Sequence, residues 1–164
     1  FVLLSAILSL VWTSEFVSGD AAGDREILER IVVQTHHNER LEGTEVHISV
    51  QSGQVILSGT VYLYSQKILY EHIVEQTPGV VEITNEVRVV PRLPVEDAEI
   101  ARHIHTLIKG HQRFQHAGIT VDVTQGAVSL SGMFYDPGDF LFLKHQVAEI
   151  EGVIRLEISA QFVT

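Results

Sequence analysis

Residues 50–59 read VQSGQVILSG, and residues 123–132 read VTQGAVSLSG. The shift of 73 positions that joins these stretches also places residues 24–91 on residues 97–164 without a gap, and 17 of the 68 aligned pairs are then identical. The identities concentrate at glycines and apolar positions, where backbone geometry and burial restrict the choice of residue. The chain is therefore predicted to contain two copies of one unit. A unit of about 70 residues has a marginal core, so mutual packing is expected.

Each quoted stretch predicts a tight hairpin, because apolar and polar residues alternate on both sides of Ser52-Gly53 and of Gln125-Gly126. Apolar residues at helical spacing precede and follow each hairpin, and a last alternating run ends each copy. A strand–helix–strand connection places its two strands parallel. The predicted class is therefore α+β, with two tandem αββαβ units, each a three-stranded mixed sheet with two helices on one face.

Three glycines recur at the same places in both copies and are predicted to define the turns. In chain order they fall in the hairpin turn, at the end of the returning strand and after the second helix. We expect them to allow, respectively, a tight turn, a bend or the close approach of a helix, and a left-handed helix C-cap. The six positions are Gly53, Gly59, Gly79, Gly126, Gly132 and Gly152.

The copies are joined by residues 91–94, Pro-Arg-Leu-Pro. Two prolines bar helical continuity and favour a stiff, extended tether, so the units should hold a defined relative orientation. The predicted domains are residues 24–90 and 95–164. Asp97, shortly after the linker, is a candidate helix N-cap.

The start of the chain differs from the rest. Residues 1–17 are apolar and carry no charge before Glu15, a length typical of a signal-peptide core and short of a bilayer span. Small residues follow, so residues 1–21 are predicted to be a signal peptide that begins before the first residue given, with cleavage after Gly19 or Ala21. An uncleaved anchor and a buried core helix are the alternatives. The absence of cysteine excludes a disulfide and a lipoprotein cysteine.

Charge and motif content exclude several function classes. The net charge is −10, and the 11 Lys and Arg residues are not clustered, which argues against nucleic-acid binding and against attraction to anionic lipid by charge. Nine histidines occur, but none has the spacing of a known metal motif, and only His72 and His145 are equivalent in the two copies. No Ser, His and Asp set has a catalytic spacing. The chain is interpreted as non-enzymatic, without a cofactor or metal.

The pattern Val50-x-x-Gly53-x-Val55-x-Leu57-Ser58-Gly59, followed by a helix and Pro78-Gly79-Val80-x-x-Ile83-x-Asn85, resembles the BON domain, a family of bacterial osmotically inducible and nodulation proteins. The second copy keeps the glycines but has Glu151 and Ile158 in place of the family's Pro and Asn. The resemblance implies an exported, periplasmic tandem protein that contacts phospholipid membranes and supports envelope integrity under osmotic stress. It implies no catalytic residue, and the lipid-anchoring cysteine of some members is missing.

The candidate contact residues are apolar. Phe140, Leu141 and Phe142 precede a core-facing Leu143, so the run is more than one helical stripe can bury. The first copy has Ile68 and Leu69 at the places of Leu141 and Phe142. These five residues are expected either to bury an interface between the units, which two small cores favour, or to form a membrane or partner patch. On the patch hypothesis, Phe142→Asp abolishes liposome binding without unfolding the protein.

Two alternatives to phospholipid binding stay open at this point. A protein-interaction module could use an exposed sheet face or sheet edge to dock an envelope partner. A small ligand or ion could bind at oxygen ligands that leave little trace in a sequence. The oligomeric state is not predictable from the sequence.

Overall fold

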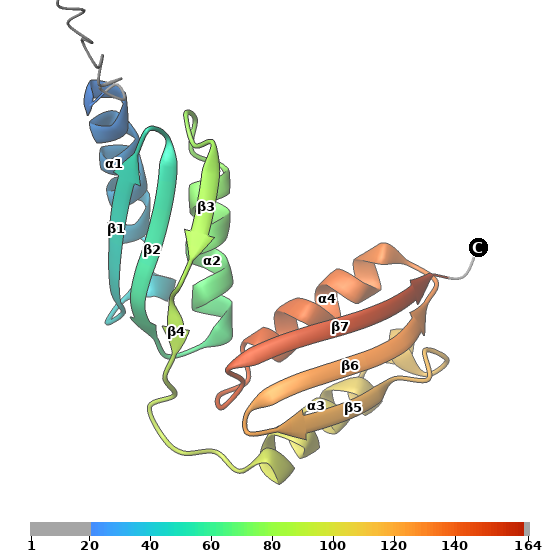
Figure 1. The fold of residues 1–164 in the computed structure, drawn as a ribbon. Helices are drawn as coiled ribbons and strands as arrows, with labels where there is room; N and C mark the ends of the chain where they lie inside the picture. Colours follow the sequence, from blue (N-terminus) through green and yellow to red (C-terminus); the bar gives the residue numbers. More distant parts are fainter. Residues whose placement is uncertain (1–20, 163–164) are drawn as a thin grey trace, which may run out of the picture.

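The computed structural model describes residues 21–162. The predicted signal peptide therefore lies outside the described residues except for Ala21, which is the first residue of helix α1. The two copies form two separate α+β units with the same order of elements (Figure 1). Among the helices within residues 21–162, none combines the length and the apolar character needed to cross a bilayer.

Each unit has the predicted αββαβ order. Unit 1 contains α1 (Ala21–His36), the short 3-10 helix η1 (Glu39–Leu41), β1 (Glu45–Gln51), β2 (Gln54–Val61), α2 (Tyr64–Glu75), β3 (Glu82–Asn85) and β4 (Arg88–Val89). Unit 2 contains α3 (Asp97–Gly110), η2 (Gln112–Phe114), β5 (Thr120–Thr124), β6 (Ala127–Phe134), α4 (Pro137–Ala148) and β7 (Arg155–Phe162).

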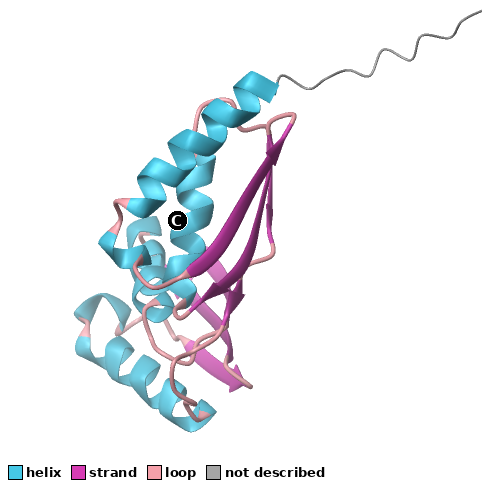
Figure 2. Cartoon of the chain, turned by 90° about the vertical axis from the view of Figure 1, so that its left-hand side faces the viewer, coloured by secondary structure: helices cyan, strands magenta, loops and turns pink. Residues whose placement is uncertain are grey.

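Both sheets are mixed, as expected from the strand–helix–strand connection. The hairpin strands β1 and β2 are antiparallel, as are β5 and β6, whereas β3 and β7 run parallel to the strand before them. The strands form one layer and the helices another, so that one face of each sheet is covered (Figure 2). The predicted fold class is confirmed.

Unit 1 departs from the prediction in its last strand, which is broken into β3 and β4, both paired with β2. Asn85 holds the break: its Nδ2 donates to the Glu71 carboxylate at 2.9 Å, and its Oδ1 accepts from the Val87 N–H at 3.2 Å. Ile158 takes this place in unit 2 and makes no such bonds, so β7 is continuous over eight residues.

The hairpin turns match their sequence prediction and have an additional support. Ser52 and Gly53 both have positive φ (52° and 76°), as a two-residue turn of the mirror-image type requires. The Asp24 carboxylate accepts hydrogen bonds from both N–H groups of this turn. Asp97 does the same for the second hairpin, so its predicted role as a helix N-cap is wrong. Glu96 occupies the N-cap position, without a side-chain bond.

The other repeated glycines do not have the structural roles expected from the sequence. A Cβ on Gly59 would lie 2.0 Å from the Glu45 carbonyl oxygen, so the neighbouring strand, not a helix, comes close there. Gly132, its equivalent, has no positive φ. Gly79 and Gly152 have φ of 96° and 93° but lie three residues beyond the helix C-caps, in a later turn. The C-cap interpretation is therefore wrong for both.

Each unit has its own hydrophobic core between the sheet and its two helices. The fully buried residues of unit 1 include Ile31, Leu57 and Val74, and those of unit 2 include Ile104, Leu130 and Val147. The three residues of unit 2 are the equivalents of the three of unit 1 in the repeat, so the burial pattern follows the sequence alignment.

Candidate functional site

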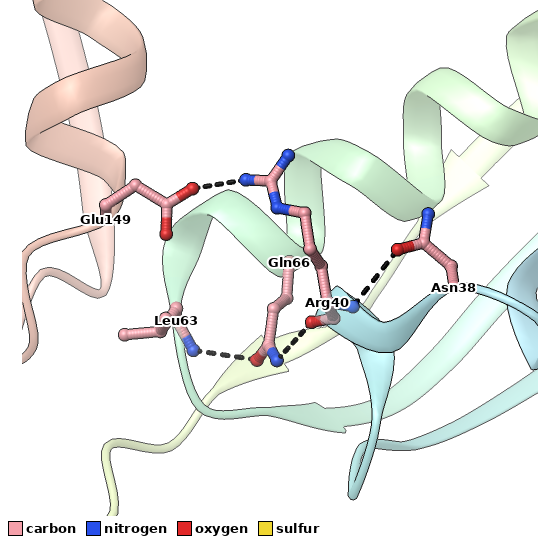
Figure 3. Close-up of polar contacts among 5 residues, drawn as sticks. All are labelled: Asn38, Arg40, Leu63, Gln66 and Glu149. Atoms are coloured by element: carbon pink, nitrogen blue, oxygen red, sulfur yellow. Dashed lines mark hydrogen bonds and ion pairs between the residues drawn. The ribbon is translucent and has the colours of Figure 1, made fainter.

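The units contact each other through α2 of unit 1 and the far end of α4 in unit 2. Tyr64 and Ile68 of α2 pack against the core of unit 2. Beside them, the Arg40 guanidinium forms an ion pair with Glu149, which follows α4 (Figure 3). Burial raises the pKa of the Tyr64 phenol, and a hydrogen bond with the backbone of Leu156 acts in the opposite direction.

Gln66 fixes the position of Arg40 at this contact. Its Oε1 accepts from the Leu63 N–H at 3.1 Å, and its Nε2 donates to the Arg40 carbonyl oxygen at 2.8 Å. The Arg40 N–H in turn donates to the Asn38 Oδ1 at 3.1 Å (Figure 3). The loop that carries Arg40 is therefore attached to the first turn of α2, and the guanidinium reaches unit 2 from a fixed base.

The inter-unit contact uses different surfaces on the two units. In the repeat, Arg40 is equivalent to Arg113 and Glu149 to Gln76. Because Gln76 is uncharged, the corresponding ion pair cannot form, and Arg113 pairs with Asp139 of its own unit at 3.1 Å. The contact is thus head-to-tail, and the surface of unit 2 that corresponds to the covered end of unit 1 is left free.

The structure separates the five candidate contact residues. Ile68 lies at the inter-unit contact, and Leu69 packs on the core of its own unit. Phe140 and Phe142 are half-buried in two different aromatic clusters of unit 2. Leu141 is half exposed to solvent, at 50%.

Phe142 packs inside unit 2, against the segment that contains η2, and so belongs neither to an inter-unit interface nor to a fully exposed patch. Its ring centroid lies 5.1 Å from that of His111 and 6.2 Å from that of Phe114. The Arg113 guanidinium lies 4.6 Å from the ring centroid, in a cation–π arrangement. A charge at this position would disturb the packing of unit 2, so Phe142→Asp does not isolate membrane contact.

The ends of β6 and β7 and the start of α4 form the end of unit 2 that is remote from unit 1 (Figure 1). We call this end the distal tip, and its large apolar residues are Met133, Tyr135, Phe140, Leu141 and Phe162. Met133 lies on the sheet face opposite to Phe162, because its partner in the register is Gln161. Three elements meet there because β6 and β7 are parallel and end together, and α4 starts three residues after β6. Four of the five side chains are well exposed: Tyr135 65%, Phe162 52%, Leu141 50% and Met133 43%.

The distal tip is supported from beneath by an aromatic cluster. The ring of buried Phe134 lies 5.7 Å from that of Phe140, in an edge-to-face arrangement, and 6.5 Å from that of Phe162. Phe140 and Phe162 are themselves 6.0 Å apart. Such packing fixes the exposed rings in place, so the apolar surface is preformed.

The charges closest to the distal tip in sequence are partnered. The Asp136 carboxylate accepts from the Gly138 N–H at 2.7 Å and caps α4, and Asp139 pairs with Arg113. Asp136 is exposed directly after Tyr135, so the tip carries a negative charge beside its apolar residues and no basic residue. Attraction to an anionic surface by charge is therefore not expected, and apolar contact would have to provide the binding.

The equivalent end of unit 1 is polar or covered. Lys67 replaces Phe140 and donates to the Val87 carbonyl oxygen at 2.8 Å, and Ile68 is covered by unit 2. Tyr62, the equivalent of Tyr135, lies under the Arg92 guanidinium of the linker. Sequence reasoning missed Met133, Tyr135 and Phe162. The signal was available in the alignment of the copies, where Thr60 becomes Met133 and Val89 becomes Phe162.

No metal or catalytic centre emerges from the described residues. Within residues 21–162, no three His, Cys, Asp or Glu side chains come together in a way that could hold a metal ion. The equivalent histidines His72 and His145 both line a cavity of about 530 Å³ between the units. The two histidines that recur in the repeat therefore both lie near the contact between the units.

Comparison with solved structures gives distant matches. Two solved structures from Chlamydia trachomatis are similar: one is described as CdsD, a structural protein of the type III secretion system, and the other as the C-terminal domain of CdsD. Both are 14% identical, with TM-scores of 0.35 and 0.36, and cover 85% and 86% of this chain. The chain spans 63% and 67% of their lengths, respectively. No curated protein matches.

The BON domain family model matches residues 23–91 and again residues 96–155, which together are most of the chain. Proteins with this domain are generally non-enzymatic and associated with the periplasm or the cell envelope. The two matches coincide with the two αββαβ units. The chain therefore belongs to the BON-domain family, as a tandem BON-domain protein.

Proposed function

We propose that this protein is an exported, non-enzymatic component of the cell envelope that binds phospholipid surfaces and supports envelope integrity under osmotic stress. The observation that carries the proposal is the distal tip, where several large apolar or aromatic side chains are exposed. Soluble proteins seldom expose several large apolar residues side by side unless the surface has a binding role.

The chemistry of the distal tip suits the boundary between lipid headgroups and acyl chains. Phe162 and Leu141 can leave water for the acyl region, and Tyr135 carries a hydroxyl that can stay among the headgroups. Because the tip has no basic residue and the protein is acidic, binding should depend on apolar insertion rather than on anionic lipid.

Pelleting of the full chain with liposomes tests the proposal. We expect the protein to pellet with phosphatidylcholine vesicles, with little change on adding phosphatidylglycerol or on raising the salt concentration. Leu141→Asp should lower the bound fraction about tenfold, since a charge placed at the tip must be dehydrated on insertion. The far-ultraviolet circular dichroism of this variant should match that of the parent protein.

Val33→Asp is the matched control, because Val33 is 57% exposed on a helix of the other unit. It should bind like the parent protein. Failure of the parent protein to pellet with any lipid composition would sink the proposal. So would an equal loss of binding in the Val33 variant, because the tip would then have no special role.

A protein-interaction module is the second candidate, and the continuous strand β7 favours it. β7 is the last strand of its sheet, so within residues 21–162 its outer edge has no pairing strand over eight residues and could accept an extended segment of a partner. Inert liposomes together with a stoichiometric partner, whose binding is lost on Ala160→Pro, would favour this candidate over lipid binding.

A further inference from the structure

Unit 1 contains a cavity of about 540 Å³ between the end of α1, strand β1 and the loop that holds η1. That volume falls within the range of roughly 300–1,000 Å³ typical of small-molecule sites. Its apolar wall is formed by Val32, Leu41, Val46 and Ile48. The cavity lies in unit 1 and shares no residue with the distal tip, so it is independent of the proposed membrane contact.

The polar wall of this cavity includes the hydroxyls of Thr44 and Tyr70. Thr44 Oγ1 donates to the Leu41 carbonyl oxygen at 2.7 Å and lies 2.8 Å from the Tyr70 hydroxyl. Because the Thr44 proton is used, the Tyr70 hydroxyl must donate to Thr44. The lone pairs of the Tyr70 oxygen then remain available to a donor in the cavity, and Tyr70 is only 6% exposed.

The second copy shows what this part of the fold accommodates. Asn38 and Leu41, which line the cavity, are replaced in unit 2 by His111 and Phe114. The two ring centroids lie 6.0 Å apart, so these rings pack on each other. Unit 1 has no aromatic residue at either position.

We propose that the unit 1 cavity binds a ligand with an aromatic ring and a hydrogen-bond donor. The ring lies against the apolar wall, where unit 2 has its own rings, and the donor reaches the Tyr70 oxygen. The rim carries Glu39 and Glu42 beside His36 and His37. With histidine counted as neutral, the rim is negative and disfavours an anionic ligand.

Titration of the isotope-labelled full chain, followed by NMR, tests the proposal with three probes of similar size. Phenol should cause saturable shifts at the methyl groups of Val46 and Ile48. Cyclohexanol, whose ring is not aromatic, and benzoate, which is anionic, should bind at least about tenfold more weakly. Equal binding of all three probes, or no saturable shift with phenol, would overturn the proposal.

Two variants locate the site. The double change Asn38→His and Leu41→Phe copies unit 2 and should abolish the phenol shifts. Tyr70→Phe removes the acceptor and should weaken phenol about tenfold, as expected for loss of one hydrogen bond. Tyr70→Phe keeps the test decisive if the double variant fails to fold. Unchanged phenol affinity in Tyr70→Phe contradicts the assigned acceptor.

Discussion

The Asp24 carboxylate holds the hairpin of unit 1 through Gly53, whose N–H donates to Asp24 Oδ1 at 2.9 Å across 29 residues. Its second oxygen accepts from the Ser52 N–H at 2.7 Å. Asp97 repeats both bonds in unit 2 at 2.8 and 2.7 Å. The first helix of each unit is thus attached to the far end of its sheet by a single side chain.

Asp24→Ala should lower the free energy of unfolding of unit 1 by about 1–2 kcal/mol, because two charge-assisted hydrogen bonds are lost at a partly exposed site. Chemical denaturation followed by circular dichroism measures the change. Glu29→Ala is the control: Glu29 bonds only to Arg25 on the exposed surface of the same helix, and its loss should cost less than about 0.5 kcal/mol. Equal effects of the two changes would show that the hairpin bonds contribute little.

Gly59→Ala should destabilise unit 1 by at least about 1–3 kcal/mol, since φ is +116° and the new Cβ would collide with the Glu45 carbonyl oxygen. Gly132→Ala should cost less, because its nearest neighbour is the side chain of Ile119 at 3.0 Å and its φ is not positive. Gly110→Ala meets nothing within 4 Å and should be close to neutral. Thermal denaturation gives the order, and a Gly59 variant as stable as the Gly110 variant would contradict it.

Tyr64→Phe should flatten the pH dependence of stability above pH 10. Burial raises the pKa of Tyr64 in the folded protein, so the neutral phenol stabilises the fold fully below its unfolded pKa. This contribution is lost as the pH rises through the folded pKa. The parent protein should therefore lose stability more steeply with pH than the variant. Denaturant midpoints measured from pH 8 to pH 11 provide the comparison, and parallel curves would exclude Tyr64 as the cause.

Asn85→Ala should lower the free energy of unfolding by about 1–2 kcal/mol, because the bonds that hold the break between β3 and β4 are removed. Exchange of the Val87 amide proton should become faster, which NMR can follow directly. Thr84→Ala, one residue earlier on the exposed face, should change neither quantity appreciably. Unaltered exchange at Val87 in the Asn85 variant would mean that the backbone alone maintains the break.

The repeat, the hairpins and the order of elements were predictable because they depend on local periodicity and on glycine. The hairpin role of Asp24 and Asp97 was not, since it joins residues nearly thirty positions apart and an acidic residue at a helix start has a simpler local explanation. Asn85 was recognised as a family residue, but its bonds to α2 and to Val87 require three-dimensional knowledge.

The candidate surface was predictable only in part. Helical periodicity indicated that the run at 140–142 exceeds one stripe, and Leu141 is indeed exposed. It could not show that Phe142 packs on η2, because the neighbours of a helix flank come from other elements. Phe162 lies beside Phe140, the neighbour of Leu141, only through the parallel pairing of β6 and β7, which brings distant strand ends together.

The head-to-tail contact between the units gives the molecule a polarity that a two-fold symmetric pair would lack. A bilayer that engages Leu141 and Phe162 meets unit 2 alone, because the matching end of unit 1 is covered around Ile68. On the proposed function, unit 1 would then lie on the membrane-distal side, and its cavity would open to the surrounding compartment. The two copies of one sequence would thus have different roles, with unit 2 in contact with lipid and unit 1 directed away from it.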